Sequence, residues 1–203
     1  MSSTSPDTVM VACSVLKAEV EKLRKLYWQD LPLRFLSSML HMKPELLEQR
    51  LSELITEEAS QGHQVLLVYG DCCAGMADME SLPGVARTPC YNCCGLLLGR
   101  DEYRRLEHEG AFFLIPEWAS RWWEIFDREL GLNHDNAHDL MQEMHSRLVY
   151  LNTGIVPVPV EDLKACAEYV GLPFEIMPIE LDNMTAAIST AFEQLRTMEK
   201  YHG

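Results

Sequence analysis

The sequence predicts an α/β protein with a doubly wound, mostly parallel sheet and helices on both faces. Short apolar runs of strand length alternate along the chain with longer segments whose apolar residues recur at helical spacing. Gly and Pro, which are typical of turns, separate many of these segments. The 203 residues are 47% hydrophobic, enough to bury one core without disulfide bonds. We therefore expect a disordered tail at residues 1–7 and a single α/β domain over residues 8–203.

The predicted strands are short runs rich in Val, Leu, Ile and Phe, most of which lead into a turn or a helix start. They lie at residues 9–13, 65–69, 85–88, 111–115, 148–151 and 174–179. The predicted helices have amphipathic spacing and recognisable ends, such as Pro44 in the first turn of one and Gly171 before Pro173 after another. They lie at residues 15–27, 43–60, 77–82, 94–99, 102–108, 116–131, 135–144, 160–170 and 182–201.

The composition excludes several classes of protein. A net charge of −14 argues against a general nucleic-acid binder or a protein that binds anionic membranes. No apolar run approaches the ~20 residues that span a bilayer, and residues 1–7 lack the features of a secretory signal. We expect a cytoplasmic, reducing location, where seven cysteines serve as thiols or metal ligands rather than disulfides. The sequence leaves a homo-oligomer open.

Five of the seven cysteines fall in two short segments, residues 69–75 and 90–95. Cys13, Cys72 and Cys93 each follow a different predicted strand. Ligands of doubly wound sheets bind beyond the carboxyl ends of the strands, near the point where the strand order reverses. We therefore expect these three thiols to meet at one edge of the sheet.

Three thiolates favour zinc or an iron–sulfur cluster. Three protein ligands on zinc leave one position for water, for a substrate thiol or for His41, the one histidine that we consider a candidate ligand. The spacing of the cysteines matches neither a zinc finger nor a ferredoxin. The alternative for all three is that small apolar cysteines pack near the sheet without a ligand.

A second hypothesis is thiol redox chemistry. Cys90 and Cys93 form a Cys-x-x-Cys pair, which a helix start would activate by lowering a thiol pKa. The two are equally compatible with being ligands of one metal site. A third hypothesis is a non-catalytic interaction protein whose cysteines are structural. Cys166 lies in an apolar helical pattern and is predicted to be core.

Other residues of the two segments are candidates for supporting roles. Asp71 could orient a ligand or act as a base, and stabilisation of the turn is an equally good explanation. Gly70, Gly75 and Gly95 could let the backbone approach a ligand closely. Because no complete phosphate-binding glycine pattern is present, we do not predict a nucleotide site.

These same residues give the chain a resemblance to domain-of-unknown-function family 1638 of archaea and bacteria. The resemblance spans most of the chain and rests on recurring short motifs. They are Ala12-Cys13, Leu40-His41 before Pro44, Tyr69 to Cys72, Gly84 to Arg87, Cys93 before Leu96 to Gly99, Pro116-Glu117-Trp118, and residues 148–151. The chain departs from the family in having Asn92 where His or Asp is usual, and in its extra thiols Cys73, Cys90 and Cys94.

The resemblance implies a part in anaerobic one-carbon or methyl-transfer metabolism, because members of the family are often found beside corrinoid-dependent methyltransferase systems. It implies a corrinoid protein or a methyltransferase as partner. It does not establish whether the chain is an enzyme or an accessory metalloprotein. If the usual His or Asp supplies a ligand or accepts a proton, Asn92 changes that role in this chain.

Overall fold

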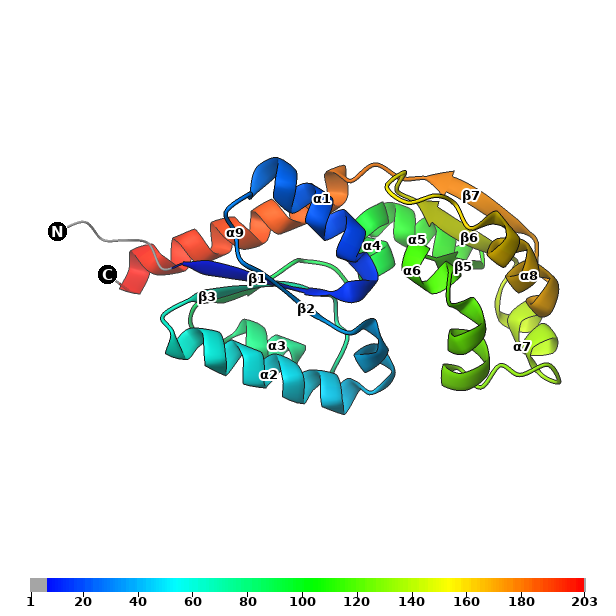
Figure 1. Cartoon of the computed structure of the whole chain (residues 1–203), viewed down its shortest axis with the longest axis horizontal. Coiled ribbons are helices and arrows are strands. Elements are labelled where there is room, and N and C mark those ends of the chain that lie inside the picture. Colours follow the sequence, from blue (N-terminus) through cyan, green and yellow to red (C-terminus); the bar gives the residue numbers. More distant parts are fainter. Residues whose placement is uncertain (1–6, 203) are drawn as a thin grey trace. The chain divides into compact units, whose positions relative to one another are not determined.

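The computed structural model describes residues 7–202 and groups the chain into two compact units, where the sequence predicts one domain over residues 8–203 (Figure 1). The first unit joins the chain up to Leu96 with the segment from Asp182 onward, and the second covers Leu97–Leu181. Apart from Asp7, the predicted tail at residues 1–7 lies outside the described residues.

The first unit is built on a four-stranded sheet with the order β2-β1-β3-β4, in which every neighbouring pair is parallel. Its central strands are entirely apolar or nearly so: residues 9–13 of β1 and all of β3 are buried. The elements are β1 (Thr8–Cys13), η1 (Ser14–Leu16), α1 (Lys17–Tyr27), β2 (Leu33–Leu36), η2 (Ser38–Met42), α2 (Pro44–Ser60), β3 (Gln64–Val68), α3 (Met76–Glu80), β4 (Val85–Arg87), α4 (Cys93–Leu98) and α9 (Asp182–His202).

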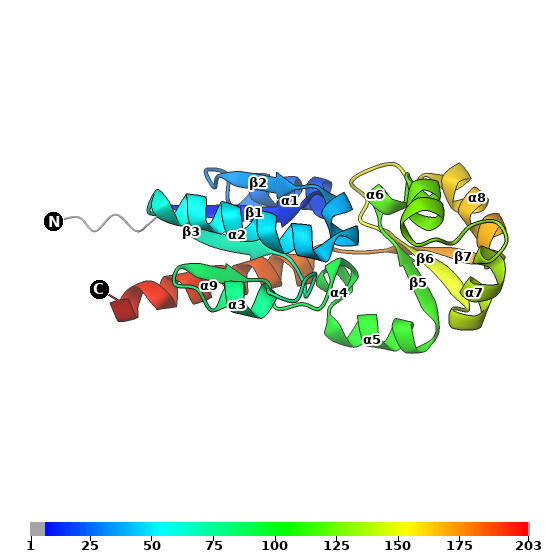
Figure 2. The ribbon, with the colours of Figure 1, turned by 90° about the horizontal axis from the view of Figure 1, so that it is seen from below.

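Helices cover both faces of this sheet. Helices α1 and α9 lie on one face, where Trp28 and Phe192 stack with ring centroids 5.5 Å apart, and α2 and α3 lie on the other (Figure 1). Figure 2, seen from below, has α2 and α3 in front of the strands. The chain passes from β1 to β2 on one side and then crosses to β3 on the other side of β1. The strand order therefore reverses between β1 and β3, the switch point of a doubly wound sheet.

The second unit holds a separate three-stranded parallel sheet with the order β5-β6-β7. Residues of β6 and α8 pack with Phe126 and Met141 into its core, which includes Cys166 as predicted. The elements are α5 (Arg100–His108), β5 (Ala111–Leu114), α6 (Pro116–Ala119), η3 (Glu124–Glu129), α7 (Ala137–Met144), β6 (Arg147–Asn152), α8 (Val160–Val170) and β7 (Phe174–Pro178).

The α/β class with parallel strands is confirmed, and the seven strands found within residues 7–202 are divided between two sheets. Six of these strands match predicted ones, whereas β2 was not predicted. Three of its four residues are apolar and only partly buried, and the fourth, Arg34, is charged and exposed. The segment therefore lacks the continuous apolar run that predicts a buried strand. The single helix predicted over residues 116–131 is corrected: α6 ends at Ala119 and a π-helical segment, η3, follows. Among the described helices, none has the length and apolar character to cross a bilayer.

Candidate functional site

The three predicted thiols come from the carboxyl ends of neighbouring strands in the first unit. Cys13 is the last residue of β1, Cys72 follows β3, and Cys93 begins α4 after β4. Because β1 and β3 flank the switch point, the first two lie where doubly wound sheets bind ligands. The side chain of Cys13 is buried, and those of Cys72 and Cys93 keep partial exposure. We refer to these three side chains as the thiol cluster.

The members of the thiol cluster interact with one another. A hydrogen bond joins the Cys13 and Cys93 side chains, and Cys72 is close enough to affect Cys93 electrostatically. The hydrogen bond with Cys13 and burial raise the pKa of Cys93 well above its ordinary value. Burial raises the pKa of Cys72 to about 12, despite a hydrogen bond with the Gly70 backbone that lowers it. Without a compensating cation, both thiols stay protonated at neutral pH.

These raised pKa values argue against the thiol redox hypothesis. A Cys-x-x-Cys pair used as a nucleophile needs a lowered thiol pKa. Burial raises the pKa of Cys90 as well, even though its hydrogen bond with Thr88 and the charge of Arg87 lower it. Both members of the pair are therefore held as thiols. All seven cysteines lie within the described residues 7–202, and no disulfide joins any of them.

Backbone contacts connect the two cysteine-rich loops. The Asp71 amide donates to the Tyr91 carbonyl at 2.7 Å. A Cβ on Gly70 would lie 2.5 Å from the Tyr91 carbonyl carbon and 2.6 Å from the Asn92 Cα, so only glycine fits there. The buried Thr88 hydroxyl donates to the Tyr69 carbonyl at 3.0 Å. The backbone at Gly70 thus approaches the other loop closely, and the ligand contact that we predicted for Gly70 stays a prediction.

The two other predicted glycines also have partners within the protein. The Gly75 amide donates to Glu48 Oε2 on α2 at 2.9 Å, and a Cβ there would lie 2.6 Å from the Glu48 side chain. The Gly95 amide donates to Asn92 Oδ1 at 2.8 Å. Asn92 thereby stabilises the start of α4, a role that Asp fills equally well. Ligand contacts for these glycines stay a prediction.

Asp71 anchors the first loop to the end of β4. Its carboxylate forms an ion pair with Arg87 at 2.8 Å, and its side chain is 55% exposed. Arg87 also binds Glu80 of α3 at 2.9 Å, so one guanidinium joins the loop, the strand and the helix. The arrangement matches the turn-stabilising explanation for Asp71. Its role as a catalytic base stays a prediction.

The extra thiols have different surroundings. Cys90 lies against the Tyr69 carbonyl, with its sulfur 3.6 Å from that oxygen. Burial raises the pKa of Cys94 to about 12. Burial and the nearby Glu48 carboxylate raise the pKa of Cys73. All three are therefore thiols at neutral pH, and Cys90 and Cys73 also affect Cys72 electrostatically.

His41 lies in η2, after the strand that neighbours β1. It is half-buried, and burial lowers its pKa, which favours the neutral imidazole that metals bind. Across residues 7–202, no three His, Cys, Asp or Glu side chains are already placed to hold a metal ion. His41 and the thiol cluster are thus not a preassembled ligand set. A metal would have to draw the side chains together.

Tyr69 is a site residue that the sequence analysis did not single out as a functional group. Its side chain is 2% exposed, and its hydroxyl has no hydrogen-bond partner among the residues that the structure describes. Burial and the nearby Cys13, Cys72, Cys93 and Cys73 raise its pKa above the ordinary value. The signal was available in principle, because a tyrosine that ends an apolar strand buries a hydroxyl that needs a partner.

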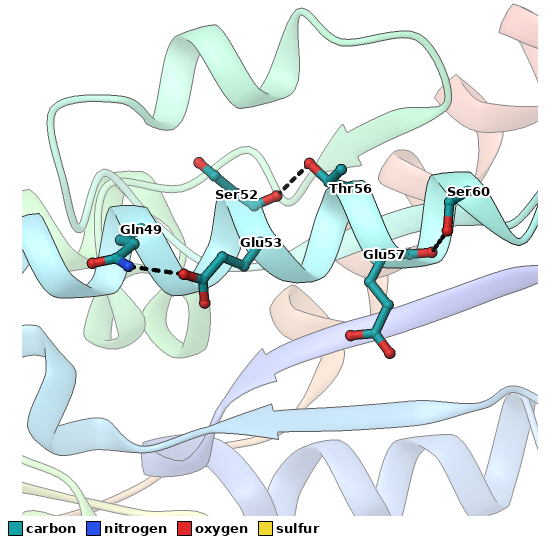
Figure 3. Close-up of a pocket in the computed structure, with 6 residues that line it drawn as sticks. All are labelled: Gln49, Ser52, Glu53, Thr56, Glu57 and Ser60. Atoms are coloured by element: carbon teal, nitrogen blue, oxygen red, sulfur yellow. Dashed lines mark hydrogen bonds between the residues drawn. The ribbon is translucent and has the colours of Figure 1, made fainter.

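Two surface hollows contain none of the cysteines. One, of about 600 Å³, runs along α2 and is lined by that helix alone (Figure 3). Its polar groups bond within the helix, as Gln49 does to Glu53 at 2.8 Å and Thr56 to the Ser52 carbonyl at 2.8 Å. The other lies in the second unit and is lined by Trp122, His134, His138, Ala165, Glu168 and Tyr169.

Comparison with known proteins places the chain in a family. A family model described as "Protein of unknown function (DUF1638)" matches residues 35–188. The chain belongs to this family. The matched range includes Cys72, Cys93 and His41, and Cys13 precedes it. A search of curated proteins and a search of solved structures found no match.

Proposed function

We propose that this member of the DUF1638 family binds zinc or an iron–sulfur cluster through Cys13, Cys72 and Cys93. Its role is in anaerobic one-carbon or methyl-transfer metabolism, as an enzyme or an accessory metalloprotein, with a corrinoid protein or a methyltransferase as partner. The location is the cytoplasm, where a reducing environment keeps cysteines as thiols. The metabolic role and the partner rest on the family resemblance, and the metal rests on the site.

One observation supports the metal proposal: thiols from three separate segments lie near one another at the carboxyl edge of a parallel sheet, with Cys13 and Cys93 hydrogen-bonded to each other. Packing alone does not require sulfur at all three strand ends. The raised pKa values of Cys72 and Cys93 disfavour an uncompensated thiolate, and a soft cation supplies the missing charge. The donor set therefore fits a thiophilic metal better than it fits a nucleophilic cysteine.

The chain's own residues would each have a defined task. Cys13 is fixed by β1, and Cys93 by the start of α4, so these two supply the rigid side of the site. Cys72 lies on a partly exposed loop and would close on the ion by a change of side-chain conformation. The Gly70 contact and the Arg87–Asp71 ion pair hold the two loops in register. Zinc with an open position would lower the pKa of a coordinated substrate thiol and keep it nucleophilic.

Elemental analysis of the full chain, purified without oxygen, tests this proposal. We expect about one zinc per chain, or iron with acid-labile sulfide, in the wild type. Cys72→Ala should reduce the metal content to about a tenth or less while leaving the fold intact, because the loop side chain is only partly buried. The measurement is metal content per chain together with the circular dichroism melting curve.

Cys166→Ala is the matched control, because it removes a buried thiol in the second unit without touching the site. It should lower the melting temperature and leave the metal content unchanged. If the wild type carries neither metal after reconstitution, or if Cys72→Ala changes only the melting temperature, the cysteines are structural and the proposal is wrong.

A further inference from the structure

We propose that the hollow of about 580 Å³ in the second unit binds a small organic cation with an alkylated ammonium group. The hollow is lined by Trp122, His134, His138, Ala165, Glu168 and Tyr169, and we call it the aromatic hollow. All six residues belong to the second unit, whereas the thiol cluster belongs to the first. The inference therefore goes beyond the proposed function and does not depend on a metal.

Contacts within the second unit hold the walls of the aromatic hollow in place. Trp122 lies just before η3 and Tyr169 lies on α8, and both rings pack against the core of the unit. The Tyr169 hydroxyl donates to the Leu132 carbonyl at 2.8 Å, which fixes the position of its ring. The Gln142 side chain on α7 donates to the Gly171 carbonyl at the end of α8 at 2.7 Å, which joins these two helices.

Two aromatic rings form one wall of the hollow. The ring centroids of Trp122 and Tyr169 lie 5.4 Å apart, with an angle of 53° between the ring planes, so the two rings do not stack flat on each other. Trp123 packs against both rings, and it is 49% exposed. The face of an aromatic ring attracts a cation, and tryptophan attracts it most strongly. Clustered rings of this kind recognise quaternary ammonium ligands.

The charge around the hollow is negative. Glu168 lines it, and of the described residues that line the hollow none is a lysine or an arginine. Two further carboxylates are near, because burial together with Asp127 and Asp135 raises the pKa of Tyr169. Three carboxylates around one hollow favour a cationic ligand and disfavour a phosphate or a carboxylate.

The lining also distinguishes an alkylated ammonium group from other cations. A guanidinium or a primary ammonium has several N–H donors, and each donor needs an acceptor when the group leaves water. Glu168 supplies the single carboxylate among the described lining residues, and the His138 Nε2 atom already lies 3.2 Å from the Gln142 amide. An alkylated ammonium group carries its charge beneath alkyl groups, so ring faces and one carboxylate are sufficient for it.

Titration of the ¹⁵N-labelled full chain with choline chloride, followed by NMR, tests this inference. We expect choline to bind with a Kd of about 1 mM or lower and to shift the indole N–H signal of Trp122. Trp28 lies in the first unit, so its indole signal is the internal reference and should not shift. The neutral analogue 3,3-dimethylbutan-1-ol has the shape of choline without its charge, and it should bind at least about 10-fold more weakly. The titrations are made at pH 8, where free imidazole is neutral.

Charge reversal at residue 168 tests the part that the carboxylate plays. Glu168 is exposed, so Glu168→Lys should fold, and it should raise the Kd for choline by about 10-fold because attraction is replaced by repulsion. The matched control is Asp162→Lys, which makes the same change at an exposed position of α8 outside the hollow. It should change the Kd by less than about twofold.

Removal of an indole tests the aromatic wall. Trp122→Leu should raise the Kd for choline by at least about 10-fold, because the larger ring face is lost. The matched control is Trp118→Leu, since Trp118 packs against the same core without lining the hollow. It should leave the Kd within about twofold of the wild type. If circular dichroism shows that Trp122→Leu does not fold, the two charge variants decide the question.

Several results would contradict the inference. One is the lack of a saturable shift of the Trp122 signal up to about 10 mM choline. Another is an equal Kd for choline and its neutral analogue, which would make the hollow a purely apolar site. Equal weakening by Glu168→Lys and Asp162→Lys would also overturn it, because the effect would then come from the net charge of the chain. So would tighter binding of ethylguanidinium than of choline, because the hollow would then select hydrogen-bond donors.

Discussion

The thiols of Cys72 and Cys93 are held in the protonated form by their surroundings. Burial raises the pKa of Cys72 to about 12, and the hydrogen bond with Cys13 together with burial raises that of Cys93. Metals bind thiolates, so binding must release these protons to solvent. The energetic cost of deprotonation falls as the pH rises, and the affinity for a metal rises in step.

We therefore predict a steep pH dependence of metal binding. At least two protons leave when Cys72 and Cys93 bind zinc, so the Kd should fall by about 100-fold or more per pH unit between pH 6 and pH 8. Competition with a chromophoric chelator measures it, after correction for the chelator's own protonation. Cys72→Ala releases one proton fewer, so the pH dependence of any residual binding should be about 10-fold per pH unit weaker than in the wild type. A Kd that is independent of pH would mean that the thiols are already ionised.

At the residue scale, the sequence predicted the positions of the thiols better than the contacts that hold the cysteine loops in place. Cys13, Cys72 and Cys93 could be placed because each follows an apolar strand, and strand ends of a parallel sheet share an edge. The contact of Gly70 with Tyr91 could not, because it depends on the path of the loops in space. Local spacing carries the first kind of information and not the second.

At the scale of elements, strands β1, β3 and β4 and the loops after them form the site. The loops after β3 and β4 come this close because Gly70 has no side chain, and the Thr88 hydroxyl donates a hydrogen bond to the Tyr69 carbonyl. The sequence predicted these strands and loops, and it missed β2 because an edge strand need not be continuously apolar. The sequence also predicted one continuous helix where the structure has α6 and η3, because both segments carry apolar residues at helical spacing.

The loop contact predicts the effect of a methyl group at residue 70. Gly70→Ala should push the loops apart and destabilise the protein by about 3 kcal/mol, the upper range for inserting an atom group into a packed site. The Kd for zinc should also rise in this variant, because Cys72 and Cys93 lie on the two loops that move apart. Urea unfolding and the chelator competition measure the two effects.

Gly62→Ala is the control for this substitution. Gly62 has a φ of +81° and nothing within 4 Å of an added Cβ, so only backbone strain of about 1 kcal/mol is expected. Zinc affinity should be unchanged in that variant. Equal destabilisation by the two substitutions, or an unchanged zinc Kd in Gly70→Ala, would contradict the idea that the loop contact shapes the site.

At the scale of the whole molecule, all the proposed ligands belong to one compact unit. Cys13, Cys72, Cys93 and His41 lie in the unit built on the four-stranded sheet, whereas Cys166 belongs to the core of the other unit. The alternation of strands and helices predicted the α/β class. It could not predict that the strands divide into two sheets, because parallel strands carry the same pattern whichever sheet they join.

This division predicts where metal binding stabilises the chain. A ligand present at about 100 times its Kd stabilises the state that binds it by about 2.7 kcal/mol, which slows exchange from openings of that unit by about 100-fold. Hydrogen exchange measured by mass spectrometry should therefore slow on zinc addition in peptides from β1, β3 and β4, and not in peptides from β6 and α8. Cys72→Ala should remove the effect, and Cys166→Ala should keep it. Equal slowing in β6 would mean that the two units open as one cooperative structure. Slowing confined to β6 and α8 would mean that zinc does not bind at the thiol cluster, and it would contradict the proposal.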